Sequence, residues 1–177
     1  MRICVFCGSK HGNKPIYADS ARHVGRLLAE RGIGLVYGGG HVGLMGVLAD
    51  TVLSGRGEVI GVIPQSMVEA ELAHLQLTEL HIVESMHARK ALMAEKSDAF
   101  LALPGGVGTA EEFFEIATWR QLKLHDKPVG LLNVNGFFDP LIAWMERAFA
   151  EGFISPKHRG LVRVATSPEE ILSSLQP

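Results

Sequence analysis

Two glycine-rich turns carry the residues with the clearest chemical potential. Residues 38–43 read GGGHVG after the second apolar run of the chain, and residues 105–109 read GGVGT after the fifth. Glycine lets backbone amides approach a phosphate closely, and the amino terminus of a following helix adds unpaired N–H donors with partial positive charge. Together the turns favour one bound phosphorylated molecule, with Gly39 and Gly40 in the first turn as candidate contacts. Ordinary tight turns are the alternative.

The first turn fits the pattern G-x-G-x-x-G, so a dinucleotide-binding domain must be considered. In that fold the motif follows the first strand, and an acidic residue ends the next one. Here the motif follows the second predicted strand, and the next strand ends in Ile63-Pro64-Gln65. Neither turn fits G-x-x-x-x-G-K-[ST], so ATP chemistry with magnesium is also disfavoured.

Carboxylates follow the second turn at helical spacing. Thr109 and Glu112 have the T-x-x-E spacing of a capping box, in which Thr109 is the N-cap and Glu112 reaches back to its amide. Glu115 lies three residues further, on the same helix face. The alternative is catalytic, because a carboxylate beside a phosphate site can activate water or stabilise an oxocarbenium-like centre.

Arg89 and Lys90 form a cationic pair early in a predicted helix that Ser85 caps. Cations gain nothing from the helix dipole at that position. The pair is therefore either solvated surface charge or a site for a phosphate or a polarised leaving group. Gly8 and Ser9 follow the first strand and are further candidate ligand contacts, although an ordinary turn is an equal alternative for Ser9.

The sequence predicts no metal and no cofactor. Cys4 and Cys7 have the C-x-x-C spacing but lie in an apolar β-like run, with no second ligand pair, and are interpreted as buried strand cysteines. The eight histidines lack H-E-x-x-H or other close ligand spacing.

Length and composition predict one globular domain, residues 1–177, and the two glycine-rich turns make it a candidate nucleotide-binding domain. The net charge of −2 gives no basic footprint for nucleic acid. No secretory leader and no run of about 18 apolar residues is evident, so we expect a soluble cytoplasmic protein without a membrane partner.

Apolar β-branched runs alternate with helical patterns along the chain. This order predicts an α/β fold, a doubly wound, mainly parallel seven-stranded Rossmann-like sheet flanked by helices. Helices are expected from Pro15 to before Gly32, from Gly43 to Ser54, from Met86 to Lys96, from Thr109 to His125, from Asp139 to Glu151 and from Ser167 onward, with a loop and a helical turn over 65–76. Strands are expected at 2–7, 33–37, 58–63, 78–83, 98–103, 128–133 and 161–164.

Residues 104–112, PGGVGTAEE, fit the motif P-G-G-x-G-T-x-x-E, and residues 86–90, MHARK, precede it. With the runs CGS at 7–9, YGGG at 37–40, GLMG at 43–46 and HDKPVGLLN at 125–133, the chain resembles the lonely guy (LOG) family of cytokinin-activating phosphoribohydrolases over nearly its whole length.

The resemblance implies cleavage of a nucleoside 5′-monophosphate, such as a cytokinin riboside monophosphate or AMP, to free base and ribose 5-phosphate without a cofactor. It places the catalytic arginine and glutamate at Arg89 and Glu112. A further substrate glutamate falls at Glu71, although Glu69 is close by. The remaining substrate-binding positions that it implies are Lys90, Gly106, Val107, Gly108, Thr109, Ala110, Glu111 and Thr118.

Two other functions stay open. Relatives have often been labelled lysine decarboxylases, but a pyridoxal phosphate enzyme needs a Schiff-base lysine, and neither glycine turn contains one. A nucleotide-binding carrier or sensor could share the fold without chemistry.

The expected assembly is a homodimer with the active site at or near the interface. Residues 91–94 and residues 113–119 give two helices wide apolar surfaces that need cover on more than one side. Neighbouring helices of the same chain could provide that cover equally well, and the resemblance favours the dimer.

Overall fold

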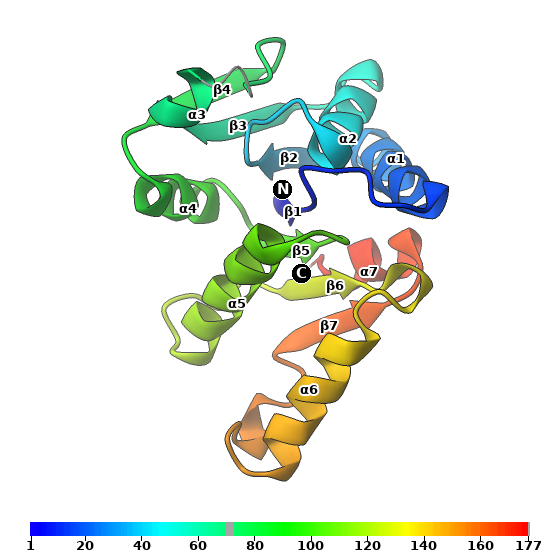
Figure 1. Cartoon of the computed structure of the whole chain (residues 1–177), viewed down its shortest axis with the longest axis vertical. Coiled ribbons are helices and arrows are strands. Elements are labelled where there is room, and N and C mark those ends of the chain that lie inside the picture. Colours follow the sequence, from blue (N-terminus) through cyan, green and yellow to red (C-terminus); the bar gives the residue numbers. More distant parts are fainter. Residues whose placement is uncertain (70–72, 177) are drawn as a thin grey trace.

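The computed structural model describes residues 1–69 and 73–176. Seven parallel strands form one sheet in the order β4-β3-β2-β1-β5-β6-β7 (Figure 1). The sequence prediction of a seven-stranded Rossmann-like sheet is confirmed. The strands are β1 (Arg2–Phe6), β2 (Gly34–Tyr37), β3 (Val59–Pro64), β4 (Glu79–Val83), β5 (Ala99–Ala102), β6 (Val129–Leu132) and β7 (Val162–Ala165).

The helices are α1 (Pro15–Glu30), α2 (Gly43–Ser54), α3 (Gln65–Glu69), α4 (Met86–Glu95), α5 (Val107–Gln121), α6 (Asp139–Ala150) and α7 (Pro168–Ser174), with 3-10 turns η1 (Val134–Gly136) and η2 (Pro156–His158). They cover both faces of the sheet, which is why the inner strands are buried over almost their whole length. Successive residues of β1 alternate between the two cores: Ile3 and Val5 pack with α1, α2 and α7, whereas Cys4 and Phe6 pack with α4, α5 and α6.

The direction in which strands are added reverses between β4 and β5. Strands β1 to β4 extend the sheet one way, and β5 then pairs with the free side of β1. The loops that leave β1 and β5 consequently turn to opposite faces, and open α/β sheets bind ligands in the crevice between such loops. This switch point brings residues 8–12 beside residues 104–106.

Helix α5 corrects two details of the sequence interpretation. Its N-cap is Gly106, so Thr109 lies inside the first turn and the capping box with Glu112 is wrong. The helix ends at Gln121 and does not continue to His125, because Lys123 takes a left-handed backbone (φ 62°). The amides of Lys123 and Leu124 then bond back to the carbonyls of Arg120 and Trp119, which closes the helix.

Cys4 and Cys7 are buried and form no disulfide, in agreement with the sequence interpretation. Within residues 1–69 and 73–176, no helix is long and apolar enough to cross a membrane.

Candidate active site

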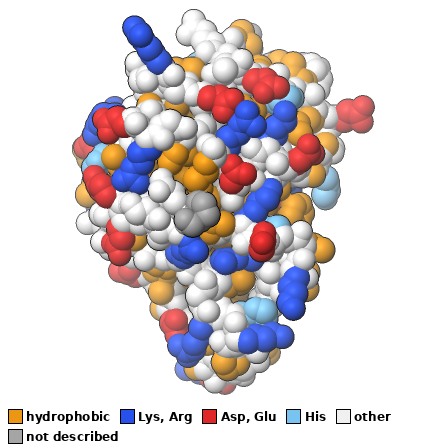
Figure 2. All heavy atoms as spheres, turned by 180° about the vertical axis from the view of Figure 1, so that it is seen from behind, with side chains coloured by type: hydrophobic (Ala, Val, Ile, Leu, Met, Phe, Trp, Pro, Cys, Tyr) orange, Lys and Arg blue, Asp and Glu red, His pale blue; other side chains and the backbone are white. Residues whose placement is uncertain are grey.

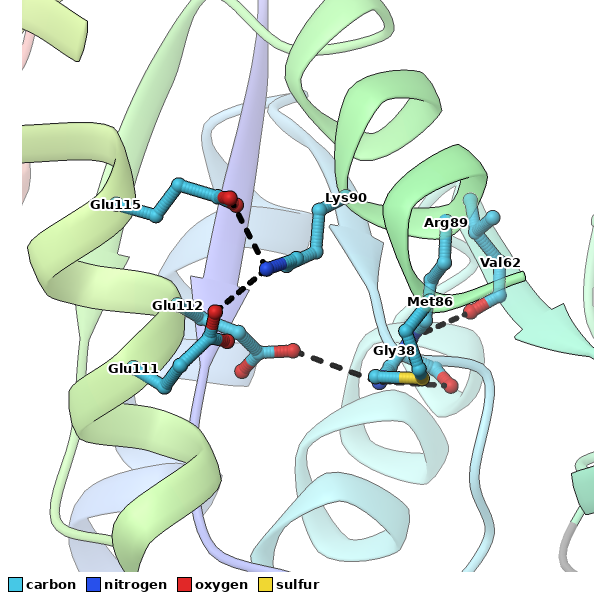
Figure 3. A network of polar contacts seen from close by, with 8 residues as sticks. All are labelled: Gly38, Val62, Met86, Arg89, Lys90, Glu111, Glu112 and Glu115. Atoms are coloured by element: carbon cyan, nitrogen blue, oxygen red, sulfur yellow. Dashed lines mark hydrogen bonds and ion pairs between the residues drawn. The ribbon is translucent and has the colours of Figure 1, made fainter.

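Arg89 projects from the first turns of α4 to the carboxyl ends of β2 and β3. The Ser85 hydroxyl accepts a hydrogen bond from the amide of Ala88, which confirms Ser85 as the N-cap. The Arg89 guanidinium donates from Nε to the carbonyl of Val62 (3.1 Å) and from Nη2 to the carbonyl of Gly38 (3.3 Å) (Figure 3). Arg89 is only 6% exposed, so it is not a solvated surface charge.

Gly38 provides the space that this guanidinium occupies. A Cβ atom at residue 38 would overlap Nη2 of Arg89. The glycine after β2 is therefore required by an arginine 51 residues later in the chain. The sequence interpretation attributed the glycines of this turn to a phosphate and missed this role; only the strand order brings the two residues together.

Glu112 faces Arg89 from α5. Its Oε1 lies 3.6 Å from Nη1 of Arg89, and the residue is 9% exposed. Burial raises the pKa of the Glu112 carboxyl, because the charged form loses hydration, while the nearby Arg89 guanidinium opposes the shift. A buried carboxyl with a raised pKa beside a fixed cation is the arrangement that active sites use for acid, base or charge-stabilising chemistry.

Lys90 makes a second link between the same two helices. Its Nζ donates to Oε1 of Glu115 at 3.0 Å and also to Oε1 of Glu111 (Figure 3). The bond to Glu111 raises the pKa of the Lys90 ammonium. Glu115 is thus paired with Lys90, although the sequence had offered it as a second carboxylate beside Glu112. Its other oxygen, Oε2, is buried without a hydrogen-bond partner within the described part of the chain.

A cavity of about 310 Å³ opens at the switch point of the sheet. Gly8 and Ser9 line it from the β1 side, and Gly105 and Gly106 from the β5 side. The Gly8 amide donates to the carbonyl of Pro104 (3.1 Å), which holds the two loops together. This volume lies at the lower end of the roughly 300–1,000 Å³ that small-molecule sites span.

The start of α5 offers backbone donors at the edge of this cavity. No atom lies within 4 Å of where a Cβ would stand at Gly106 or Gly108, so the backbone there is open to a ligand. Thr109, by contrast, is 5% exposed, and its Oγ1 packs where a Cβ of Gly105 would be. Ala110 donates its amide to the carbonyl of Gly106 (3.1 Å), which leaves the earlier amides of the turn for an anion.

Two aromatic side chains in the same cavity were not singled out from the sequence. Tyr17 of α1 and Phe137, just before α6, meet edge to face with ring centroids 5.7 Å apart. They give the cavity an apolar wall. No local motif marks them, because they belong to elements that only the folded sheet brings together.

Other predicted contacts lie outside this cavity. Gly39 and Gly40 are buried: the Gly39 carbonyl accepts from the amide of His74 (2.8 Å), and Gly40 pairs with Ala73. Thr118 is exposed two turns along α5 from Glu111. Glu71 lies outside the described residues, as does the side chain of Glu69.

Metal ligands do not gather at this site. Across residues 1–69 and 73–176, no group of three or more His, Cys, Asp or Glu side chains is placed to hold a metal ion.

Known proteins match this chain over almost its whole length. A rice protein (Oryza sativa subsp. japonica) named as a probable cytokinin riboside 5′-monophosphate phosphoribohydrolase is 52% identical over 99% of this chain and 78% of its own. A cytokinin riboside 5′-monophosphate phosphoribohydrolase of Arabidopsis thaliana is 50% identical over 99% of this chain and 82% of its own. This chain belongs to the LOG phosphoribohydrolase family.

The LOG assignment agrees with a family model described as "Possible lysine decarboxylase", which matches residues 45–175. Phosphoribohydrolases are N-glycosyl hydrolases that act on nucleotides, so the enzyme class predicted from the sequence is confirmed at this level.

Solved structures share the fold of this LOG family member at lower identity. A molybdenum cofactor carrier protein from Chlamydomonas reinhardtii superposes with a TM-score of 0.73 at 24% identity, covering 98% of this chain and 94% of its own. A molybdenum cofactor binding protein from Rippkaea orientalis gives 0.72 at 24% identity, covering 98% and 95%. At these identities the likeness supports the fold alone.

Proposed function

We propose that this protein hydrolyses the N-glycosidic bond of nucleoside 5′-monophosphates and releases the free base and ribose 5-phosphate. The observation that carries the proposal is the buried Glu112 carboxyl, 3.6 Å from the fixed guanidinium of Arg89 at the carboxyl end of the parallel sheet.

The 5′-phosphate binds at the start of α5 in this proposal. The open backbone at Gly106 and Gly108 supplies N–H donors, and the helix terminus adds partial positive charge. Gly8 and Ser9 line the opposite side of the same cavity. Glu112 lies about one and a half turns into the helix that begins at Val107, so a bound phosphate and the carboxylate lie on one element.

Cleavage then requires a water oxygen to bond to the anomeric carbon while the carbon–nitrogen bond to the base breaks. Glu112 orients this water and stabilises the positive charge that develops on the ribose ring. Arg89 holds Glu112 in place and anchors the substrate or assists the departing base. The proton released by water ends on the base, which restores the enzyme.

The substrate range follows from the relatives. The names of these relatives specify cytokinin riboside 5′-monophosphates. AMP has the same ribose, phosphate and purine and lacks only the cytokinin side chain, so we include it as a substrate.

Thr118 and several exposed apolar side chains support the homodimer that the sequence predicts. Most of the apolar surface noted in residues 113–117 is covered within the chain, since Phe113, Ile116 and Ala117 are buried. Val107 (88% exposed), Leu124 (69%) and Trp144 (55%) nevertheless remain open on and beside α5 and α6. A second copy that covers this surface would also bring exposed Thr118 close to a site. The cytoplasmic location and the single domain over 1–177 stay predictions.

The two alternative functions make different predictions: a carrier binds the nucleotide without releasing base, and a decarboxylase releases carbon dioxide from lysine. Lys90 is held by two carboxylates and its pKa is raised, which disfavours the neutral amine that a Schiff base requires.

The deciding assay incubates purified protein with AMP and with isopentenyladenosine monophosphate and measures released base. The matching nucleosides serve as controls for the phosphate anchor, and carbon dioxide from lysine tests the decarboxylase. We expect base from both monophosphates and not from the nucleosides. Binding of AMP without any base release would establish a carrier instead.

A further inference from the structure

A second cavity lies at the other end of the parallel strands from Glu112. Its volume is about 610 Å³. It is lined by residues of the last turn of α5 and of the segments that lead into β6 and β7, whereas the active-site loops follow β1 and β5. Since all seven strands are parallel, the two cavities open at opposite ends of the strands. The lining residues are Arg120, Lys123, His125, Asp126, Lys157, His158, Arg159, Gly160 and Leu161.

The charges around this cavity are strongly unbalanced. Arg120 and Lys123 come from the end of α5, and Lys157 and Arg159 come from the segment around η2, with Asp126 as the one carboxylate among the lining residues. Figure 2 shows Lys and Arg side chains at the lower end of the molecule as well as on the rest of this face. The whole chain has a net charge of −2, so the cationic cavity is a local feature.

Arg120 also lies near Arg163, a further cation that does not line the cavity. Burial and the nearby Arg163 both lower the pKa of Arg120, and Asp126 only partly opposes them. Arg159 reaches Glu146 at 3.9 Å, a weak contact between two exposed side chains. A helix terminus favours cations, but this accounts only for Arg120 in the last turn of α5 and Lys123 just beyond it. On the second segment Arg159 also lies over the ring of Phe149, 5.3 Å from its centroid, so Lys157 is the cation whose position these contacts do not explain.

A hydrogen bond joins the two segments that form the walls of the cavity. The Arg120 guanidinium donates from Nη1 to the carbonyl of Leu161 and so joins the end of α5 to the segment before β7. Lys123 stands at the left-handed position that closes α5, where glycine is usual. The chain thus places an ammonium group at the rim in a backbone conformation that costs stability for any residue with a Cβ.

We propose that this cavity is a binding site for a small anion with two or more linked phosphates, distinct from the substrate site. Guanidinium and ammonium groups that line one cavity from two segments are the donors that phosphate oxygens prefer. Four cations around one cavity match a pyrophosphate or triphosphate group better than a single phosphate. The site stands on its own geometry and does not depend on the proposed hydrolase activity.

The experiment measures binding of inorganic tripolyphosphate by titration calorimetry at fixed ionic strength. The test variants are Lys123→Gly and Lys157→Gln, and we expect each to weaken binding by about 10-fold, the loss of one charge-assisted contact. Lys123→Gly is also expected to melt at an equal or higher temperature, because glycine relieves the positive φ. Weakened binding with retained stability therefore separates a binding role from a folding role.

Arg56→Gly is the matched control. Arg56 (φ 59°) closes α2 through the same pair of backward amide bonds, from Arg56 to Leu53 and from Gly57 to Val52. The substitution removes one cation and the same strain, away from the cavity. It should leave tripolyphosphate affinity unchanged.

Three results would overturn the proposal. One is the absence of binding at millimolar tripolyphosphate, and another is equal affinity in Lys123→Gly and wild type. The third is loss of affinity in Arg89→Ala, which would place the anion in the substrate site. A parallel titration with ATP measures whether a nucleoside adds to the affinity. An oligonucleotide that binds this face while tripolyphosphate does not would assign the surface to nucleic acid.

Discussion

The Arg89 guanidinium occupies space beside Gly38 that only glycine leaves free: a Cβ at residue 38 would overlap its Nη2 atom. The Gly38 carbonyl also accepts a bond from that same atom at 3.3 Å. A methyl group at this position must displace the guanidinium, and with it the cation that faces Glu112. In the proposed mechanism the glycine is therefore part of the catalytic geometry, although it contributes no functional group.

We predict that Gly38→Ala lowers kcat/KM for AMP by on the order of 100-fold, the loss that follows when a catalytic group is misplaced by about 1 Å. Arg89→Ala should cause a loss of similar size. If Gly38 acts only through Arg89, the double variant is no worse than Arg89→Ala alone. Additive losses in this cycle would show that Gly38 has an independent role.

Glu112→Gln should lower base release from AMP by on the order of 100-fold or more, because the amide neither activates water as a base nor stabilises positive charge. Circular dichroism should show an intact fold. Glu30→Gln, an exposed change on α1, is the matched control and should keep full activity. Near-full activity of Glu112→Gln would leave the glutamate without a catalytic role.

The same substitution should alter stability in a pH-dependent way. Because the pKa of Glu112 is raised above 4.5, the folded protein holds this proton more tightly than the unfolded chain does. That stabilisation is complete below about pH 4.5 and is lost as pH rises through the folded-state pKa.

Near neutral pH the wild-type protein has lost this stabilisation, whereas the glutamine variant has no titrating group at residue 112. Glu112→Gln is therefore expected to melt higher than wild type at pH 7.5, with the difference shrinking toward pH 4. Thermal melts across this range provide the measurement, and a difference that is constant with pH would contradict the assignment.

Base release should need neither a metal nor pyridoxal phosphate. Dialysis against a chelator is expected to leave turnover of AMP unchanged, since the proposed chemistry uses only Glu112, Arg89 and water. Activity that disappears with the chelator and returns with a divalent ion would refute this prediction.

Light scattering at micromolar concentration should give a mass near twice 19.2 kDa. Trp144→Lys, on the exposed apolar surface, should shift the protein toward monomer and lower activity with it. Phe153→Lys is the control, because it introduces the same charge at another exposed aromatic residue (86%), in the turn after α6. A wild-type monomer that still releases base would exclude both the dimer and its part in the site.

The sequence predicted each strand to within one or two residues, because most of the strands are short apolar runs bounded by turn residues. It placed Arg89 and Glu112 through family motifs, and the structure brings them together. It could not predict that Gly38 serves Arg89 or that Lys90 pairs with Glu111 and Glu115, since these contacts depend on which strands become neighbours. The start of α5 was misplaced because T-x-x-E also fits a capping box, whereas Gly106 takes the N-cap position.

The order of α4 and α5 in the chain sets when the site becomes complete during synthesis. A nascent chain that extends through α4 carries Arg89 but not the carboxylate opposite it, because Glu112 emerges only with α5. The free side of β1 stays open until β5 joins it. No amino-terminal portion that stops before α5 contains both Arg89 and Glu112, so under the proposed mechanism incomplete chains left on stalled ribosomes would not cleave nucleotides.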